Sequence, residues 1–356
     1  NSDCFEIGWG VSVYGGFAGT ETVLDDRVAG SNETVLSGDL AGDDGSSLFA
    51  DNAWHVVRVN DGARLDTVTV IGGRATSTAP DDKGGGAVVP FGSPSFYAVT
   101  FRGNVATGLG GGAFSGDGSP TFYACRFEQN SAISGGGLCV ANQDGTLPIV
   151  NCLFTENAAS ATGGALFASD AGPDVVHCTF SGNTAASGRA AYGDGKPLGI
   201  VNSILQDGGD EAVVNGATLT IAYSCWPGAS GTGNIDVDPA FADAPAGDFT
   251  LSRTSPCIDA AYFFENAPLD ADIEGTPRGF TPDMGCYERL GAGQARVPAT
   301  VPMGPGQPMT GNQDRPAIGY GDDTFLVAFR NGSDLDAVLF DKSTGKTLCD
   351  SIKVST

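Results

Sequence analysis

The sequence is short of histidine and of basic residues. Among 356 residues it has 2 histidines, and 18 lysines and arginines stand against 42 aspartates and glutamates, a net charge of -24. A surface this acidic repels nucleic acid and anionic lipid, so no nucleic-acid partner is expected. So few histidines also argue against a histidine-rich metal site or a Ser-His-Asp triad.

Long apolar runs are missing as well, so the sequence predicts no membrane span in this chain. Glycine pairs exclude helical stretches of 3.6-residue periodicity. The sequence has instead 54 glycines without a collagen period, which is typical of turns between many short strands. Apolar residues make up 41% of the chain, enough for a core.

The amino-terminal stretch has no charged-then-apolar signal segment. It enters directly into CFEIGWGVSVYGGF, whose alternation predicts a strand. We therefore expect a fragment or mature product of a longer precursor. Acidity, few lysines and abundant Gly, Asn and Thr favour an exported protein, located outside the cell or on its surface.

One phrase of the sequence, FxxN, recurs at steps of 26, 27 and 26 residues. Its copies are Phe101–Asn104, Phe127–Asn130, Phe154–Asn157 and Phe180–Asn183. A second phrase, two glycines and an apolar pair, lies between them, at Gly85–Val88, Gly111–Phe114, Gly136–Cys139 and Gly163–Leu166, with a decayed copy at Gly188–Tyr192. Repetition at a fixed period indicates architecture rather than chemistry.

Strand alternation assigns a face to each position of this repeat, because alternate residues share a face. Tyr123, Cys125 and Phe127 are predicted to point inward, and Ala124 and Arg126 outward. The inward columns of the other repeats are Tyr97, Val99 and Phe101, then Val150, Cys152 and Phe154, then Val176, Cys178 and Phe180, then Val201, Ser203 and Leu205. The outward columns, which include Ala98, Asn151, His177 and Asn202, indicate a mostly solvated face without a stripe of exposed aromatic residues.

These columns predict an all-β fold, a right-handed parallel β-helix in which each coil buries its inner face against its neighbours. Asn104, Asn130, Asn157 and Asn183 are expected at one corner, where asparagine tolerates left-handed geometry and hydrogen-bonds backbone or the next asparagine. The phenylalanines and asparagines of the repeat are therefore interpreted as structural.

Three of the cysteines occupy one inward column of the repeat, and the others lie elsewhere in the sequence. Cys125, Cys152 and Cys178 stack inward at 26 or 27 residue spacing, whereas a zinc site needs closely spaced pairs. Neighbouring coils lie within disulfide range, but parallel Cβ vectors strain such a bridge, so buried thiols are favoured. Cys4, Cys139, Cys225 and Cys349 have no assignable partner.

The chain divides into three parts on this pattern. Residues 1–289 are the β-helix, with entry coils at 1–60, regular coils at 61–224 and closing coils at 225–289. Residues 290–313, rich in Pro and Gly, are expected to be a linker. Residues 314–356 resume strand signals in AIGY, TFLVAFR and DAVLFD, which predict a short antiparallel β segment.

The repeat resembles that of chlamydial-type polymorphic outer membrane proteins. GVSVYGGFAGTETVLDDR with NETVLSGDL resembles the entry coils of such bacterial surface proteins, and NIDVDPAFADAPAGDFTLSRTSPCIDA with DADIEGTPRGFTPDMGCYE resembles their closing coils. The resemblance covers roughly residues 5–289. It implies a secreted or cell-surface β-helix, often adhesin-like, with no catalytic residues to carry over. Family closings usually have a small residue where Cys286 stands, which suggests a Cys257–Cys286 disulfide. The segment 314–356 resembles one blade of a bacterial β-propeller-like protein.

Candidate chemistry outside the scaffold is sparse. His55 and His177 have no nucleophile placed by a motif, so no catalytic or cofactor-binding residue is predicted. Asp43 with Asp44, and Asp236 with Asp238, are candidate calcium ligands; Asp81 with Asp82 form a third such pair. Turn formation and a solvated acidic face are the favoured alternative for these acids. Asp270, Asp272 and Arg278 are expected to form a closing network of ion pairs and turns.

Two function classes remain open. The first is a non-enzymatic surface β-helix that serves adhesion or forms a subunit of an extracellular, filamentous assembly, with self-association or other surface proteins as partners; an incomplete C-terminal blade favours assembly. The second is a carbohydrate-active enzyme or glycan-binding protein that uses one face of the helix. The fold alone does not decide between them.

Overall fold

The structure is a computed structural model that describes residues 4–27, 32–46, 49–141, 147–263, 271–278 and 281–289, together with the backbone of four strands between 317 and 355. The chain forms two compact units, Asn1–Arg289 and Leu290–Thr356. Among the described residues, no helix has the length and apolar character needed to cross a membrane.

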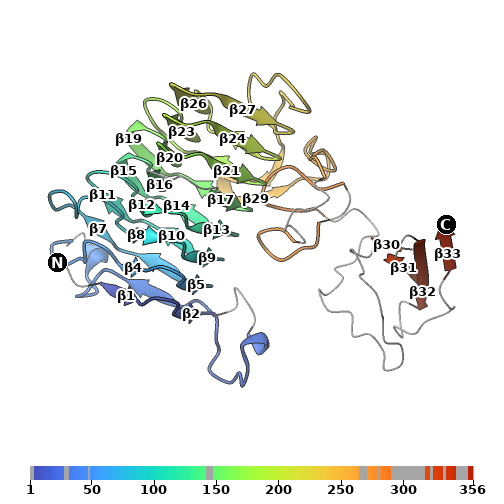
Figure 1. Cartoon of the computed structure of the whole chain (residues 1–356). Helices are drawn as coiled ribbons and strands as arrows, with labels where there is room; N and C mark the ends of the chain where they lie inside the picture. Colours follow the sequence, from blue (N-terminus) through green and yellow to red (C-terminus); the bar gives the residue numbers. More distant parts are fainter. Residues whose placement is uncertain are drawn as a thin grey trace. The chain divides into compact units, whose positions relative to one another are not determined.

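The first unit is a stack of coils whose strands pair in parallel with those of the next coil, as Figure 1 shows. Sheet A has eight strands: β1 (Phe5–Ile7), β4 (Val57–Val59), β8 (Ala87–Gly92), β12 (Ala113–Gly118), β16 (Leu138–Ala141), β20 (Leu166–Ser169), β23 (Ala191–Asp194) and β26 (Ala212–Asn215). Sheet B has eight more: β2 (Ser12–Tyr14), β5 (Arg64–Asp66), β9 (Ser95–Tyr97), β13 (Thr121–Tyr123), β17 (Leu147–Val150), β21 (Pro173–Val176), β24 (Leu198–Val201) and β27 (Leu219–Ala222).

Two further sheets, C and D, run through part of the stack. Sheet C has seven strands: β3 (Val35–Ser37), β6 (Thr69–Ile71), β10 (Thr100–Arg102), β14 (Arg126–Glu128), β18 (Leu153–Thr155), β22 (Thr179–Ser181) and β25 (Ile204–Gln206). Sheet D has four: β7 (Arg74–Ala75), β11 (Val105–Ala106), β15 (Ser131–Ser134) and β19 (Ala158–Thr162). The predicted parallel β-helix is thereby confirmed.

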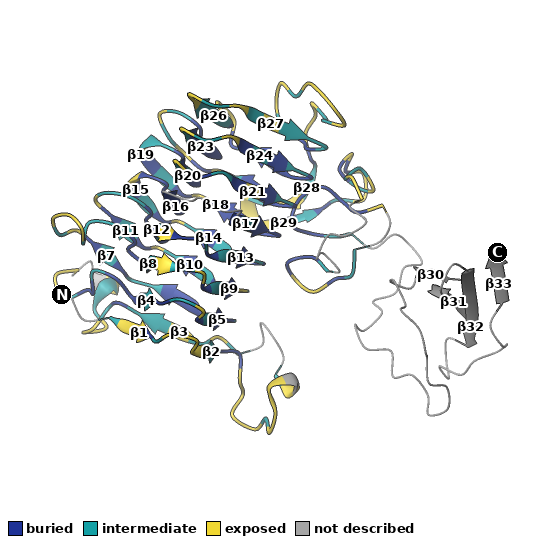
Figure 2. Ribbon diagram, in the orientation of Figure 1, coloured by how far each residue is buried: buried dark blue, intermediate teal, exposed yellow. Residues whose placement is uncertain are grey.

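The core lies inside the coils, where like residues stack on like; in Figure 2 the buried segments run along the middle of the stack. The phenylalanines of FxxN are fully buried and in register. Phe127 stacks between Phe101 and Phe154, at ring-centroid distances of 4.9 and 4.7 Å. A second buried column carries Phe96 and Phe122.

The predicted inward position of Tyr97 and Tyr123 is wrong. Tyr97 is 38% exposed and Tyr123 is half-buried, while the preceding Phe96 and Phe122 point into the core. The reason is the corner between sheets B and C. Ala124 has φ of +54°, so the alternation of β13 does not continue through the corner into β14. Cys125 is nevertheless buried.

After β27 the chain closes the unit with less regular structure. The antiparallel hairpin of β28 (Phe241–Asp243) and β29 (Asp248–Leu251) holds the 3₁₀ turn η3 (Ala244–Ala246). Two other 3₁₀ turns, η1 (Leu24–Asp26) and η2 (Asp44–Ser46), lie in the first coils. The segment 257–289, which we call the closing segment, packs back along earlier coils, where Asn202 contacts Tyr262 and Asn151 contacts Ala271.

The second unit is an antiparallel sheet of four strands in sequential order, β30 (Ala317–Tyr320), β31 (Thr324–Asn331), β32 (Asp334–Asp341) and β33 (Ile352–Ser355). The three strands predicted for this region lie in β30, β31 and β32. The predicted linker, 290–313, lies outside the described residues.

Candidate functional site

The repeated asparagines form a ladder of buried side-chain hydrogen bonds along one corner of the helix. The Oδ1 atom of Asn157 accepts the backbone N–H of Asn130 at 3.1 Å and its Nδ2 at 3.0 Å. Its own Nδ2 donates at 2.8 Å to the carbonyl of Phe127. The left-handed residue at this corner stands one position before each asparagine. These residues are Gly103, Gln129, Glu156 and Gly182, so the expectation of a left-handed asparagine is wrong. The asparagine amide satisfies the backbone that this bend leaves unpaired.

Asp207 ends the ladder where a further asparagine would stand. Its Oδ1 accepts the N–H of Asn183 at 2.7 Å and the Nδ2 of Asn183 at 3.0 Å. Its Oδ2 is buried and has no hydrogen-bond partner. Burial, and then the nearby carboxylate of Glu211, raise the pKa of Asp207 to about 8. The site occupied by an amide in the other coils therefore holds a carboxyl group that keeps its proton at neutral pH.

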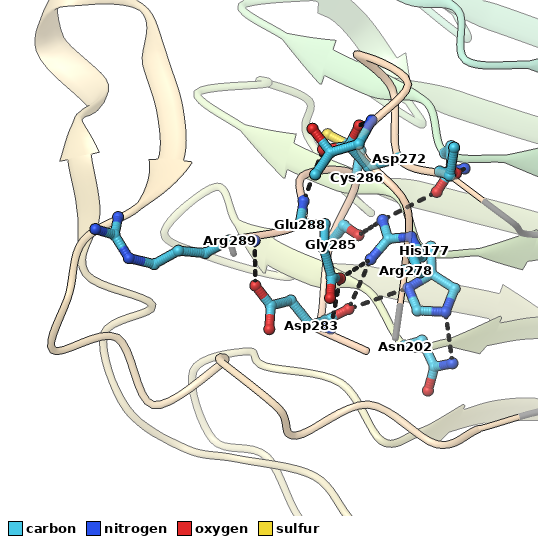
Figure 3. A network of polar contacts seen from close by, with 12 residues as sticks. His177, Asn202, Asp272, Arg278, Asp283, Gly285, Cys286, Glu288 and Arg289 are labelled. Atoms are coloured by element: carbon cyan, nitrogen blue, oxygen red, sulfur yellow. Dashed lines mark hydrogen bonds and ion pairs between the residues drawn. The ribbon is translucent and has the colours of Figure 1, made fainter. Parts of the chain in front are cut away.

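A network of buried polar contacts joins the closing segment to the corner between sheets B and C (Figure 3). Arg278 is its centre, with a side chain 2% exposed. Its Nη1 lies 3.0 Å from the Glu288 carboxylate, and its Nη2 donates to Asn151 Oδ1 at 3.0 Å and to the Gly285 carbonyl at 2.7 Å. A buried charge paired and hydrogen-bonded in this way fixes the closing segment in one position.

His177 belongs to the same network. Its Nδ1 lies 3.1 Å from the carbonyl of Asp283, and Asn202 donates its Nδ2 to His177 Nε2 at 2.9 Å. These partners fit a neutral ring with the proton on Nδ1. Burial, and then the charge of Arg278, hold the pKa of His177 well below its usual range. The ring is thus a fixed, uncharged contact.

The predicted solvated column at this corner is therefore wrong. Asn151, His177 and Asn202 are each at most 2% exposed, because the closing segment covers them. All three residues have left-handed backbone at the B–C corner, with φ of 50 to 54°. The sequence signal for this cover was the resemblance of residues 270–288 to a closing coil, since the contacts themselves join residues more than 100 positions apart.

The closing acids differ in part from the expectation. Asp272 accepts the backbone N–H groups of Glu274 and Thr276 through Oδ1 and of Glu288 through Oδ2, which makes it a turn residue. The carboxylate that pairs with Arg278 belongs to Glu288. Asp270 lies outside the described residues.

One group of acids has metal-ligand spacing. Carboxylate oxygens of Asp39, Asp43 and Asp51 lie within 4.8 Å of one another. Partial burial, and then the charges of Asp51 and Asp39, raise the pKa of Asp43. Of the predicted calcium ligands, Asp43 belongs to this group and Asp44 adjoins it, accepting a hydrogen bond from Asn52. Asp39 and Asp51 were missed, because only the fold of the η2 loop brings them to Asp43.

The other predicted acidic pair lies elsewhere. Asp236 accepts the backbone N–H of Gly228 at 2.8 Å, and Asp238 accepts that of Ala240 at 2.8 Å. Both side chains are exposed. These two carboxylates thus make turn hydrogen bonds of the kind that Asp forms with nearby backbone.

His55 has a structural environment too. It is buried, its Nδ1 lies 2.9 Å from the carbonyl of Gly84, and its Nε2 lies 3.8 Å from Asp81. The contact with Gly84 ties one coil to the loop that opens the next. The Asp81 contact exceeds hydrogen-bond range.

Aromatic residues do line one outer face, contrary to expectation. Tyr97 and Tyr123 are in register on sheet B, and their rings stack 5.2 Å apart with planes 5° from parallel. The guanidinium of Arg64 lies 5.0 Å from the Tyr97 ring centre. The Tyr97 ring is thus contacted by both Tyr123 and Arg64, which leaves its edge facing outward.

Seven buried cysteines of the described part of the chain carry free thiols: Cys125, Cys139, Cys152, Cys178, Cys225, Cys257 and Cys286. Cys125, Cys152 and Cys178 are buried, and the Cys152 thiol contacts both of the others. Cys257 and Cys286, the expected disulfide pair, lie in different buried clusters. Cys286 packs with Ala124 and Leu153, whereas Cys257 packs in another cluster with Cys225 and Leu251.

Comparisons with known proteins agree with this coil architecture. A search among curated proteins gave no match. Residues 151–169, which hold β18, β19 and β20, match the repeat of Chlamydia polymorphic membrane proteins. The chain thus carries a polymorphic membrane protein repeat within a parallel β-helix.

Proposed function

We propose that residues 1–289 are the surface-exposed β-helix of an exported bacterial protein, which acts as an adhesin-like or structural element and not as an enzyme. The observation that carries this proposal is the position of the matched repeat. Residues 151–169 form a coil whose strands pair in register with coils on both sides. A repeat typical of bacterial surface proteins is thus part of one continuous solenoid.

The polar groups of the unit support a non-enzymatic role. Catalysis by acid-base or nucleophilic chemistry needs a side chain that can reach a substrate. His177 and Arg278 are instead buried and bonded to the protein itself. The asparagine ladder is likewise enclosed between coils. These groups hold the fold together, which leaves recognition to the outer faces and loops.

The first coil supports self-association or contact with other surface proteins. Within the described residues, β1, β2 and β3 each pair with a neighbouring strand on one side and not on the other. Phe5 is 51% exposed and Trp9 is 70% exposed beside this edge. Open strand edges with apolar neighbours favour pairing with another chain, which is the basis of a filamentous arrangement in this proposal.

Glycan binding is the second candidate, because Tyr97 and Tyr123 form an outward aromatic pair. Sugars pack on the faces of aromatic rings, and here the face of Tyr97 on one side meets Tyr123 and on the other meets Arg64. Tyr97 therefore offers a ligand its ring edge and hydroxyl group. This arrangement favours the first proposal over a lectin or a polysaccharide-active enzyme.

The test uses intact cells that make the full-length protein. Protease treatment of these cells is expected to remove the β-helix while a cytoplasmic marker survives, and purified chain is expected to bind host cells or to sediment as polymers. Protection of the β-helix on intact cells would contradict surface exposure. Release of reducing ends from a polysaccharide panel by purified chain would contradict the non-enzymatic role.

A further inference from the structure

Two cysteines from different parts of the first unit meet at its closing end. Cys225 follows β27 at the last coil, and its backbone bridges to Ile204 on one side and Ile235 on the other. Cys257 opens the closing segment, where its carbonyl accepts the N–H of Met284 at 3.0 Å. Both are fully buried in one cluster with Leu251 and Met284. Their thiols are in direct side-chain contact.

We propose that Cys225 and Cys257 form a disulfide that fastens the closing segment to the last coil of the β-helix. The bond joins two segments that otherwise meet through apolar packing. It would hold in place the segment that carries Arg278, Asp283 and Glu288, the groups that cover the B–C corner.

This pair differs from the cysteine column in the geometry of approach. Cys125, Cys152 and Cys178 precede in-register parallel strands, so their Cα–Cβ bonds run side by side, which strains a bridge. Each of these thiols also donates to a carbonyl of an earlier coil, as Cys178 does to Ile149 at 3.3 Å. Cys257 belongs to no ladder strand, so its side chain meets that of Cys225 from a separate segment.

The local chemistry suits exchange. Contact with the Cys257 thiol lowers the pKa of Cys225, and the Val237 carbonyl 3.1 Å from Cys225 Sγ completes its polar surroundings. The exchange takes place during folding, before burial is complete, when the thiolate of either residue can attack the oxidant.

The oxidant is a small disulfide such as oxidised glutathione. The Cys225 thiolate attacks one of its sulfurs, forms a mixed disulfide and releases one glutathione thiolate. The Cys257 thiolate then attacks the protein-bound sulfur and releases the second glutathione. Two protein thiols are oxidised, one glutathione disulfide is reduced to two thiols, and the thiol protons end on the released glutathione.

The test is a peptide map of the full chain refolded from its reduced, unfolded state in a glutathione redox buffer. Trypsin separates the three closing cysteines, with Cys225 in Ala190–Arg253, Cys257 in Thr254–Arg278 and Cys286 in Gly279–Arg289. After free thiols are blocked with N-ethylmaleimide, we expect the first two peptides to be joined and the third to carry the label. Labelled Cys257, or Cys257 joined to Cys286, would overturn the proposal.

Two variants make the result specific. Cys286→Ser should keep the cross-link, whereas Cys257→Ser should lose it and leave Cys225 labelled. A Cys257→Ser chain that still shows Cys225 in a disulfide would contradict the pairing. Both replacements are small, and loss of folding is checked by circular dichroism before mapping.

This proposal depends on the proposed function in one respect: export would bring the protein into a compartment that contains the oxidant. The refolding experiment tests the pair itself, and the same map of protein isolated from its native source tests the compartment. A cross-link in refolded but not in native protein would contradict export and support the pairing. Its absence from both samples would overturn the pairing.

Discussion

The regular coils and the closing segment of the first unit are held by different chemistry. In the coils, each phenylalanine and asparagine contacts its own equivalents in the coils above and below. In the closing segment, Arg278 and Asp283 make contacts that occur once, with Asn151 and His177 of the B–C corner. Repetition stabilises the first region through many equal interfaces, whereas the second depends on a few buried polar groups.

The largest expected effect is in the regular coils. Phe127→Ala removes a fully buried ring from the middle of a stack, which leaves a cavity between Phe101 and Phe154. We expect a loss of about 3–5 kcal/mol in the free energy of unfolding, measured by denaturant titration. Phe91→Ala, at a ring 44% exposed, is the control and should cost less than about 1 kcal/mol. Equal losses would remove the distinction between core and surface columns.

We expect the closing segment to lose its fixed position when its buried ion pair is removed. Arg278→Met removes the cation that pairs with the buried Glu288 carboxylate. We expect a loss of about 3 kcal/mol in stability and new protease cleavage within 271–289. The matched control is Arg102→Met, because Arg102 pairs with Glu33 at 3.2 Å on the surface, where a pair contributes about 0–1 kcal/mol. Unchanged protease resistance in Arg278→Met would show that the network does not hold the closing segment.

The third expected effect lies at the boundary between the two regions and depends on pH. The pKa of Asp207 is raised from 3.8 to about 8, so the folded chain binds a proton that the unfolded chain has released. Stability should therefore fall as pH rises from about 4 to about 8. Asp207→Asn continues the ladder with an amide, and should flatten this part of the profile and stabilise the chain at pH 8 by on the order of a few kcal/mol.

The measurement for Asp207 is the unfolding midpoint across this pH range. Glu211 also has a pKa raised by burial, so Glu211→Gln is the comparison variant. Its carboxylate accepts backbone N–H groups of Asp207 and Gly208, so this change should destabilise the turn at all pH values. A pH profile that is the same in wild type and Asp207→Asn would contradict a protonated carboxyl at the end of the ladder.

The regular, repeating coils could be predicted from the sequence. A 26–27 residue period with fixed Phe and Asn positions was sufficient for the parallel β-helix, because each column stacks on its own copies in the neighbouring coils. Corners were predicted less well. Strict alternation placed Tyr123 inside, whereas one left-handed residue, Ala124, ends the alternation at the corner. Backbone geometry at one residue is not visible in a hydrophobic pattern.

Contacts that occur once in the molecule could not be predicted from the sequence, for a different reason. The thiol that meets Cys257 belongs to Cys225, and the carboxylate that meets Arg278 belongs to Glu288. No spacing rule selects either partner, since both depend on how an irregular segment folds back. The same holds for Asp39 and Asp51 beside Asp43, which meet only through the turn of the η2 loop.

Hydrogen exchange of the purified full chain, wild type and Arg278→Met, tests the central claim that a self-stacked solenoid carries a separately fastened closing segment. We predict that amides of β10, β14, β18 and β22 stay protected in both proteins, while those of 271–278 and 281–289 lose protection in the variant. Equal loss of protection in both regions would contradict the account, because it would mean that one cooperative structure spans the coils and the closing segment.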